Sequence, residues 1–424
     1  MPEIRPFKGL RYNPETVGDM ARIICPPYDV IPPSMQQELY ESSPCNSIRL
    51  ELPMEDDPYG AAAERLGEWM KNGILMQETE PALYPYSQTF TDQEGHTHTR
   101  SGLFAAMRLH EFAERKVLPH ERTLSGPKAD RLNLFRTTKT NISAIFGLYA
   151  DGEGLADSLI AGFTSANEPI IDAVFQGVRN RLWRLADSEL AVDIQKVLAE
   201  KNVYIADGHH RYETGLNYRR EREAANPGHT GEEPYNFILT YLNNIHDTGL
   251  VVFPIHRLIH SIEGFEAAKF RSRLEEHFDV TELDGRAALK AYLEAAKSSY
   301  TYGVVTAGSV LGITLRDNAA DLLDTSISPS LQKLGLVVLH EVVLTRLLGI
   351  SQEAMALQTN IVYVKDDGEV FQSVANGKAQ VGFMVKPATV AQVLDVSESG
   401  GVMPQKSTFF YPKIMTGLVF KTLD

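Results

Sequence analysis

The feature that most constrains the fold is a strand-to-helix junction near the middle of the chain. Residues 188–201 have the apolar spacing of a helix, and residues 202–207 (NVYIAD) have the composition of a buried strand. A polar, helix-like stretch follows directly after Gly208. The same alternation of strand-like and helix-like segments continues on both sides of this junction, which predicts a mixed α/β (α+β) fold.

A predicted hairpin, a predicted helix and a change in the sequence pattern near residue 262 refine this expectation. Residues 81–90 and 100–109 are strand-like on either side of the polar turn TDQEGHTH, which predicts a hairpin. Residues 61–75 predict a helix with Leu66, Trp69 and Met70 on one stripe. From about residue 262 the pattern changes, and helix-like and strand-like segments alternate as far as residue 349 without a catalytic-looking cluster. We therefore expect a site-bearing mixed α/β domain at 1–260 and a C-terminal α/β domain at 261–424.

Charge and composition exclude several classes of function. The net charge of −14 opposes general binding to nucleic acid, but a local basic cluster can still hold a small anionic substrate. No stretch approaches the roughly 20 apolar residues of a membrane helix, and the N-terminus lacks an apolar signal region. The two cysteines, Cys25 and Cys45, fit a reducing compartment. We expect a cytoplasmic protein that acts on a small-molecule substrate and has neither a nucleic-acid nor a membrane partner. A homodimer is one possible assembly.

The junction itself carries the sequence Asp207-Gly208-His209-His210-Arg211. A turn needs the glycine and can use the aspartate, but it does not need His-His-Arg. Amides at a helix N-terminus and in a glycine turn favour an anion, and an arginine fork can grip phosphate with two hydrogen bonds. The structural alternative is an Asp N-cap before a glycine turn, with both histidines satisfied at the surface.

Each side chain of this turn has a chemical role to offer. His209 and His210 can donate to phosphoryl oxygens or exchange protons near neutral pH. Asp207 can accept a proton from a hydroxyl nucleophile or hold a divalent cation shared with substrate phosphates. The turn therefore combines the parts that phosphate chemistry requires.

A second cluster lies within the segment LPHERTLSGPKADRLNLFRTTKTN. Its mixture of imidazole, carboxylate and basic groups suits a polyanion site with an acid–base residue, but it also suits a solvated loop and helix face with local ion pairs. The residues concerned are His120, Glu121, Lys128, Asp130, Arg131, Arg136, Lys139 and Asn141.

Three other segments add candidates. The segment PIHRLIH places His256 and Arg257 after a strand, where such a pair is more often structural. The segment MPQKSTFFYPK offers basic and hydroxyl groups that can reach a phosphate or cap a core strand: Lys406, Ser407, Thr408, Tyr411 and Lys413. The segment CPPYDVIPP is a rigid proline turn, in which Cys25 is a nucleophile only beside an activating base. The P-loop, HExxH and GxSxG motifs are all absent.

Five of these segments together resemble a known family. They are CPPYDVI, the stretch from PHERTLSGPK to SAIFG, YIADGHHRYETGL, GLVVFPIHRL and MPQKSTFFYPK, and they span nearly the whole chain in matching order. The chain resembles the bacterial and archaeal family of domains of unknown function numbered 1015. The DGHHR turn also resembles that of free-serine kinases built on the ParB/sulfiredoxin fold, which implies a ParB/sulfiredoxin-like core with a C-terminal α/β extension.

The resemblance implies a function and a set of site residues. It implies a phosphotransferase of serine metabolism that phosphorylates free L-serine or a similar hydroxy amino acid, with Mg²⁺ and with ADP, pyrophosphate or ATP as donor. Asp207, Glu121 and His209 would be catalytic, with Glu121 as the second acidic residue. Gly208, His210 and Arg211 would hold phosphate. Further substrate contacts would come from His120, Lys128, Asp130, Arg131, Asn141, His256, Arg257, Lys406, Ser407 and Thr408.

Two other functions use the same residues. A non-catalytic ParB-like sensor would bind nucleotide or phosphate at the turn without transferring it. A metal-dependent phosphohydrolase would use His120, His209 and His210 as metal ligands. We predict the kinase, with the sensor and the phosphohydrolase as alternatives.

Overall fold

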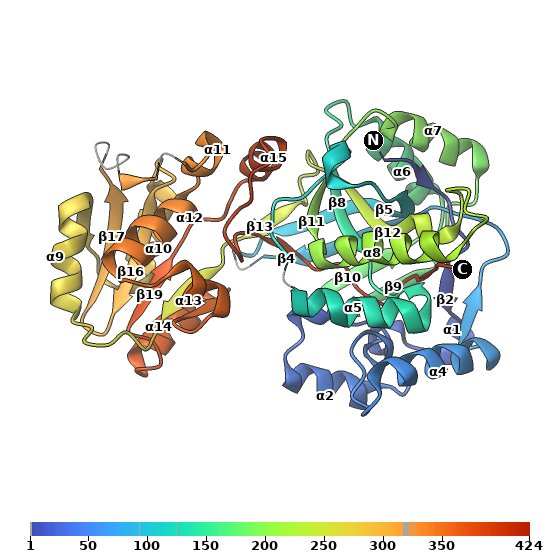
Figure 1. Ribbon diagram of the computed structural model, residues 1–424, viewed down its shortest axis with the longest axis horizontal. Helices are drawn as coiled ribbons and strands as arrows, with labels where there is room; N and C mark the ends of the chain where they lie inside the picture. The colour runs from blue at the N-terminus through green and yellow to red at the C-terminus, as the bar shows by residue number, and fades with distance from the viewer. Residues whose placement is uncertain (1, 93, 124, 317–321, 325) are drawn as a thin grey trace. The chain divides into compact units, whose positions relative to one another are not determined.

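The computed structural model describes residues 2–424 apart from 93, 124, 317–321 and 325. The predicted mixed α/β class is confirmed (Figure 1). The chain forms two compact units: unit 1 comprises Met1–Pro119, Thr123–Val251 and Pro412–Asp424, and unit 2 comprises His120–Arg122 and Val252–Tyr411. Relative to the division expected at residue 260, the change of unit comes earlier and the segment 412–424 returns to unit 1. No helix in the described part of the chain is both long and apolar enough to cross a membrane.

Unit 1 is built on a nine-stranded sheet. The predicted hairpin is confirmed: two strands of this sheet, residues 84–91 and 97–108, pair antiparallel across the turn. The order of strands is β6 (Val117–Leu118), β11 (Val203–Asp207), β8 (Ile145–Tyr149), β12 (Phe237–Asn244), β5 (Thr97–Arg108), β4 (Tyr84–Thr91), β10 (Val178–Leu182) and β9 (Ile171–Phe175), with β1 (Ile4–Arg5) also on β5. Two small pairs accompany it: β2 (Leu10–Tyr12) with β3 (Leu75–Gln77), and β7 (Thr140–Asn141) with β21 (Lys421–Thr422).

Unit 1 contains long and short helices. They are α1 (Pro14–Val17), η1 (Met20–Arg22), η2 (Tyr28–Val30), α2 (Pro33–Ser42), α3 (Ile48–Glu51), α4 (Pro58–Lys71), η3 (Phe112–Glu114), α5 (Ser125–Thr138), α6 (Leu155–Ala166), α7 (Ser188–Leu198), α8 (His209–Ala225) and η4 (Pro234–Asn236). Of these, α6, α7 and α8 pack against this sheet. Helix α4 begins where the Asp57 side chain accepts a hydrogen bond from the Gly60 amide. Its Leu66 and Trp69 are buried as predicted, but Met70 is exposed, so the predicted stripe was one residue too wide.

The two faces of the large sheet bury different residues. On one face Ile160 of α6, Ile194 of α7 and Leu216 of α8 pack against Leu103 and Ile145 in a single apolar cluster. The alternation of a β-strand sends the neighbours of these sheet residues to the opposite face. There, aromatic rings surround a fully buried guanidinium: Arg100, Tyr86, Phe104, Phe146 and Tyr241. One face is thus an ordinary apolar core, and the other contains a buried charge.

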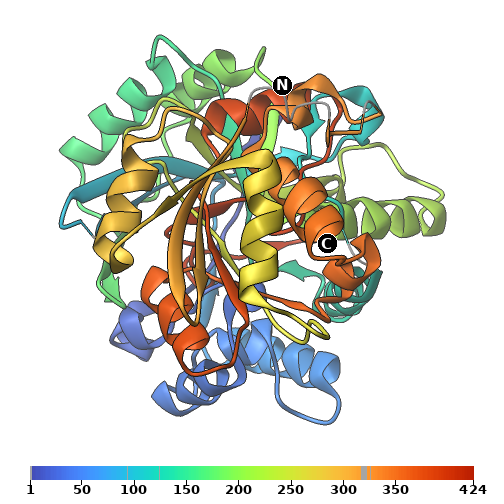
Figure 2. The same ribbon diagram turned by 90° about the vertical axis from the view of Figure 1, so that its left-hand side faces the viewer.

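Unit 2 has a six-stranded sheet with helices on both faces (Figure 2). The strand order is β15 (Phe278–Glu282), β17 (Ser309–Leu315), β16 (Thr301–Thr306), β19 (Val381–Met384), β14 (His256–Ile259) and β18 (Ile361–Val364). One apolar cluster joins the sheet to α9 (Ala267–His277), α12 (Gly335–Val338), the π-helical segment η6 (Leu339–Leu347) and α13 (Gln352–Leu357). A second joins it to α10 (Gly285–Ala295) and α14 (Asp367–Ala375). The remaining elements are α11 (Pro329–Gln332), α15 (Val390–Glu398) and the pair β13 (Val251–Phe253) and β20 (Phe409–Tyr411).

The segment 412–424 completes unit 1 and contains a buried lysine. Lys421 lies in β21 and is only 4% exposed. Its Nζ donates to the carbonyl oxygens of Pro234, at 2.8 Å, and Thr422, at 3.1 Å. Burial disfavours the charged form and lowers the pKa of Lys421 to about 7. Above about pH 7 the fold therefore favours a neutral amine, whereas the unfolded chain still carries a charged one.

Replacing this lysine changes how stability depends on pH. Between pH 7 and pH 10 the unfolded lysine, with an ordinary pKa of 10.5, still binds a proton that the buried amine has released. The free energy of unfolding of the natural protein therefore rises with pH relative to that of Lys421→Met, by up to about 1.4 kcal/mol per pH unit. Urea unfolding at several pH values measures the difference. Lys196→Met, at an exposed lysine, is the control; a difference that stays constant for Lys421→Met would contradict the prediction.

Candidate functional site

The DGHHR turn is a strand-to-helix junction, as predicted. Strand β11 ends at Asp207, and α8 begins at His209 (Figure 1). Between them Gly208 has φ of 91°, a left-handed conformation that side chains rarely adopt. A Cβ atom at this position would lie 3.1 Å from the guanidinium of Arg211. The glycine therefore serves both the turn and the close approach of the arginine.

The carboxylate of Asp207 is held by two cations. Arg211 Nη2 donates to Asp207 Oδ2 at 2.6 Å, and Lys413 Nζ donates to Asp207 Oδ1. The three side chains are 14%, 4% and 12% exposed for Asp207, Arg211 and Lys413. Burial alone would raise the pKa of Asp207, but the charges of Lys413 and Arg211 outweigh burial and hold that pKa well below its ordinary value. Asp207 is therefore a stable anion rather than a strong base.

Arg211 is bound by the protein on two sides. Besides Asp207, its Nη1 donates to the carbonyl oxygen of Ala144, just before β8. Burial lowers the pKa of Arg211, but the carboxylate of Asp207 raises it further and leaves it above the ordinary value. Beside it, His209 is buried and His210 is partly exposed at the start of α8. Of the turn's basic side chains, His210 is thus the most accessible to a ligand.

The proline turn CPPYDV lies in the electrostatic neighbourhood of the DGHHR turn. Burial raises the pKa of Tyr28, while the charges of Arg211 and Arg131 act to lower it. The guanidinium of Arg131 lies 4.3 Å from the centre of the Tyr28 ring. Burial also raises the pKa of the Cys25 thiol, which agrees with a structural role for that cysteine.

A carboxylate that the sequence analysis missed anchors this neighbourhood. Glu51 is 1% exposed. Its Oε1 accepts hydrogen bonds from the Tyr28 amide, at 3.2 Å, and from the Ser143 hydroxyl, at 2.9 Å. Among the described residues its Oε2 has no hydrogen-bond partner. A lone glutamate between the apolar residues of IRLELP was the available signal, because a carboxylate is rarely buried without a purpose.

Part of the second cluster joins the helix of the DGHHR turn. Lys128 Nζ, on α5, forms an ion pair of 2.7 Å with Glu213 Oε2 on α8. Asp130 pairs with Arg131 at 2.6 Å and accepts a hydrogen bond from the Tyr59 hydroxyl at 2.8 Å. These candidates form contacts within unit 1, as the ion-pair alternative also predicts.

Asn141 has a structural contact in unit 1. It is buried in β7, and its Oδ1 accepts a hydrogen bond from the Leu239 amide at 2.9 Å. Among the described residues its Nδ2 has no partner. Arg136 and Lys139, also named from the sequence, form exposed ion pairs with Glu221, at 2.6 Å, and Asp424, at 2.8 Å.

The other candidates gather in unit 2. His120 is buried, and its Nε2 lies 3.2 Å from Thr408 Oγ1, while its carbonyl oxygen accepts the Met403 amide at 2.8 Å. Glu121 follows it in the same unit. Arg257 Nη2 donates to the Lys406 carbonyl oxygen at 3.1 Å. The turn at residues 403–408 therefore connects two segments that are far apart in sequence.

The remaining side chains of this group form local contacts. The Ser407 hydroxyl donates to the Pro404 carbonyl oxygen at 2.6 Å, and Lys406 is exposed. His256 accepts a hydrogen bond from the Val385 amide at Nδ1, and burial lowers the pKa of its imidazole to about 4. The predicted site residues are thus divided between the two units, and their assembly into one site remains a prediction.

One group of acidic and imidazole side chains among the described residues lies close enough together to hold a metal ion. Asp92, Glu94 and His96 each offer a ligand atom within 4.8 Å of the others, at the tip of the β4–β5 hairpin. Asp92 Oδ1 accepts the amides of Glu94 and His96, both at 2.9 Å, so the turn itself explains this arrangement. The group does not include His120, His209 or His210, the ligands of the hydrolase alternative.

The comparison with known families agrees with the motifs. The family model described as a protein of unknown function, DUF1015, matches residues 4–336. The chain belongs to this family. No curated protein matches the chain at a significant level.

Several solved structures are similar to this member of the DUF1015 family. A free serine kinase in complex with AMP has a TM-score of 0.36 and 13% identity over 74% of this chain and 91% of that chain. A conserved hypothetical protein from Pyrococcus furiosus has a TM-score of 0.35 and 13% identity over 73% and 91%. SbnI from Staphylococcus aureus, truncated at its C-terminus, has a TM-score of 0.36 and 10% identity over 74% and 85%.

The double ion pair of Asp207 predicts a large effect on stability. Asp207→Asn leaves Arg211 and Lys413 buried without their counter-charge, so we expect a loss of about 3–5 kcal/mol in the free energy of unfolding. The matched control is Asp193→Asn, which breaks an exposed ion pair with Lys196 and should cost less than about 1 kcal/mol. Urea unfolding of both variants measures the contrast, and equal losses would show that the Asp207 ion pairs contribute little.

Proposed function

We propose that this protein transfers a phosphoryl group to the hydroxyl of a small molecule, with free L-serine or a similar hydroxy amino acid as acceptor. The observation that carries the proposal is the DGHHR turn between β11 and α8, with an ionised Asp207 at the end of the strand. Phosphoryl transfer depends mainly on positioning and on stabilising developing negative charge. A helix N-terminus beside buried cations supplies both requirements.

The electrostatics of Asp207 favour one of its two suggested roles. A carboxylate with a strongly lowered pKa is a weak base, because general-base catalysis works best with a pKa near the working pH. Asp207 is therefore better suited to accept a hydrogen bond from the acceptor hydroxyl and orient it than to remove its proton. His210, with its partly exposed imidazole, is suited to donate to the phosphoryl oxygens.

The second acidic residue remains part of the proposal. Glu121 is the residue suggested by the resemblance, and it belongs to unit 2. Within unit 1, Glu51 supports the turn by holding the Tyr28 amide and the Ser143 hydroxyl. We assign Glu51 a positioning role, since its carboxylate is buried and its contacts are with the protein.

The phosphate donor is proposed to be ADP, pyrophosphate or ATP, accompanied by Mg²⁺. Both oxygens of Asp207 already accept hydrogen bonds from cations, so this carboxylate does not fit a resident magnesium ion. Mg²⁺ commonly keeps several waters and binds through substrate phosphates, and here it would arrive with the donor.

Phosphorus NMR tests the proposed reaction. Purified protein is incubated with Mg²⁺, L-serine and, separately, ATP, ADP or pyrophosphate. We expect a new phosphomonoester signal with one donor, and a loss of about 10²-fold or more in its rate of formation for His210→Gln and for Asp207→Asn. Asp193→Asn is the control, and circular dichroism confirms that each variant is folded. Unchanged donor in every tube would favour the sensor, whereas free phosphate without phosphomonoester would favour the hydrolase.

Removal of metal gives a second prediction. If Mg²⁺ arrives with the donor, a chelator stops phosphoryl transfer but leaves the thermal unfolding midpoint of the donor-free protein unchanged. Differential scanning calorimetry with and without chelator measures the midpoint. A clear drop in that midpoint would instead reveal a resident metal ion.

A further inference from the structure

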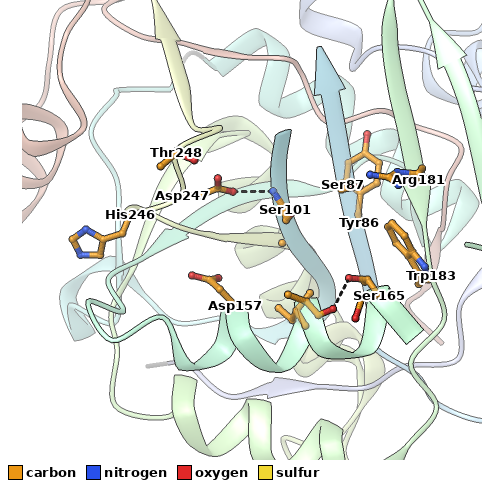
Figure 3. Close-up of a pocket in the computed structure, with 14 residues that line it drawn as sticks. Tyr86, Ser87, Ser101, Asp157, Ser165, Arg181, Trp183, His246, Asp247 and Thr248 are labelled. Carbon is orange, nitrogen blue, oxygen red and sulfur yellow. Dashed lines mark hydrogen bonds between the residues drawn. The ribbon is translucent and has the colours of Figure 1, made fainter. Parts of the chain in front are cut away.

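Unit 1 contains a cavity that none of the predicted site residues lines. Its volume is about 490 Å³, within the range of small-molecule sites. It is bounded by α6, by strands β4, β5 and β10, and by residues 246–248 after β12 (Figure 3). It therefore lies on the sheet face that α6 covers.

A row of polar residues forms the sheet side of this cavity. Arg181 pairs with Ser87 across β10 and β4, and Ser87 pairs with Ser101 across β4 and β5. Residues paired in this way have side chains on the same face of a sheet. Further along β5 the same face carries Leu103 and Ala105, which are core residues. The apolar core thus gives way to a polar row in which two small serines leave space beneath α6.

Two polar atoms of this row have no protein partner among the described residues. Ser87 is 5% exposed, and its Oγ forms no hydrogen bond. The buried Nε of Arg181 forms none either, and the guanidinium of Arg181 lies 5.4 Å from the centre of the Trp183 ring. Buried polar groups without partners are costly and uncommon. A donor and a hydroxyl are thus available together beside an aromatic ring.

The opposite side of the cavity is acidic. Asp157 Oδ1 accepts from the Tyr149 hydroxyl at 3.0 Å, and its Oδ2 accepts from Asn244 at 2.6 Å. Asp247 accepts the Ser101 amide at 2.8 Å. The groups that donate to these two carboxylates, from Tyr149, Asn244 and the Ser101 backbone, are all neutral. Because a carboxylate has about four lone-pair sites, each can accept from a cation as well.

Figure 3 shows how these groups face the cavity. Asp157, Asp247 and His246 lie on one side, Arg181 and Trp183 on the other, and Ser101 between them. We propose that the cavity binds a zwitterionic amino acid. Its ammonium group contacts Asp157 and Asp247, its carboxylate contacts Arg181 and the Ser87 hydroxyl, and its side chain packs against Trp183. This site is separate from the DGHHR turn and does not depend on the proposed phosphoryl transfer.

Calorimetric titration of the full chain with each of the common L-amino acids tests the proposal. We expect at least one to bind, and its N-acetyl and methyl-ester derivatives, which lack one charged end, to bind about tenfold or more weakly. Arg181→Gln and Asp157→Asn should weaken binding to a similar degree, and Asp193→Asn should leave it unchanged. The derivatives probe the natural protein, so the test stands even where a variant fails to fold.

Other outcomes overturn the proposal. They are no binding up to roughly 10 mM of any amino acid, equal binding of the N-acetyl derivative, or unchanged binding by Arg181→Gln. Binding that is lost in Asp207→Asn but retained in Arg181→Gln would assign the ligand to the DGHHR turn instead. Because the assay follows binding and not phosphomonoester formation, its failure is distinct from failure of the proposed function.

Discussion

The buried carboxylate of Asp207 joins three separate stretches of unit 1. Asp207 is the last residue of β11, and it pairs with Arg211 in the first turn of α8 and with Lys413 in the segment 412–424, called the returning segment below. Two further side chains hold the same segment: Arg100 donates to the Pro412 carbonyl oxygen at 2.6 Å, and Gln88 to that of Lys413 at 3.0 Å. Removing one partner of a buried ion pair is strongly destabilising, because it leaves the other charge buried without compensation. The ion pairs of Asp207 thus connect the end of β11, the start of α8 and the segment 412–424.

The ion pairs of Asp207 also limit how the turn can bind phosphate. Arg211 was expected from the sequence to grip phosphate, yet its guanidinium contacts Asp207 and the Ala144 carbonyl oxygen. An arginine has five N–H donors, so these contacts leave some of them for other acceptors. An incoming phosphate would meet a site whose net charge is set by Asp207, Arg211 and Lys413 together. The accessible imidazole of His210 and the helix amides are the other groups that the turn offers.

The sequence predicted local secondary structure well, but it did not predict which residues far apart in the chain contact each other. The β4–β5 hairpin, strand β11 and the start of α8 follow from residue spacing, because local pattern determines them. The predicted burial of Met70 is wrong, because helical spacing does not determine how wide the buried stripe of a helix is. Lys413 was recognised as a basic residue, but spacing cannot show that it reaches Asp207, 206 positions away. Glu51 carried no motif, and its importance appears only when its buried neighbours are known.

Because the segment 412–424 is synthesised last, unit 1 is completed late during translation. Unit 2 lies almost entirely between residues 252 and 411, so a ribosome synthesises it before it reaches the segment that completes unit 1. At common rates of translation this interval is on the order of ten seconds. Throughout it, the nascent unit 1 lacks the cation that shares Asp207 with Arg211, and Arg100 lacks its carbonyl acceptor at Pro412. Unit 1 therefore reaches its final charge balance only after unit 2 has been translated.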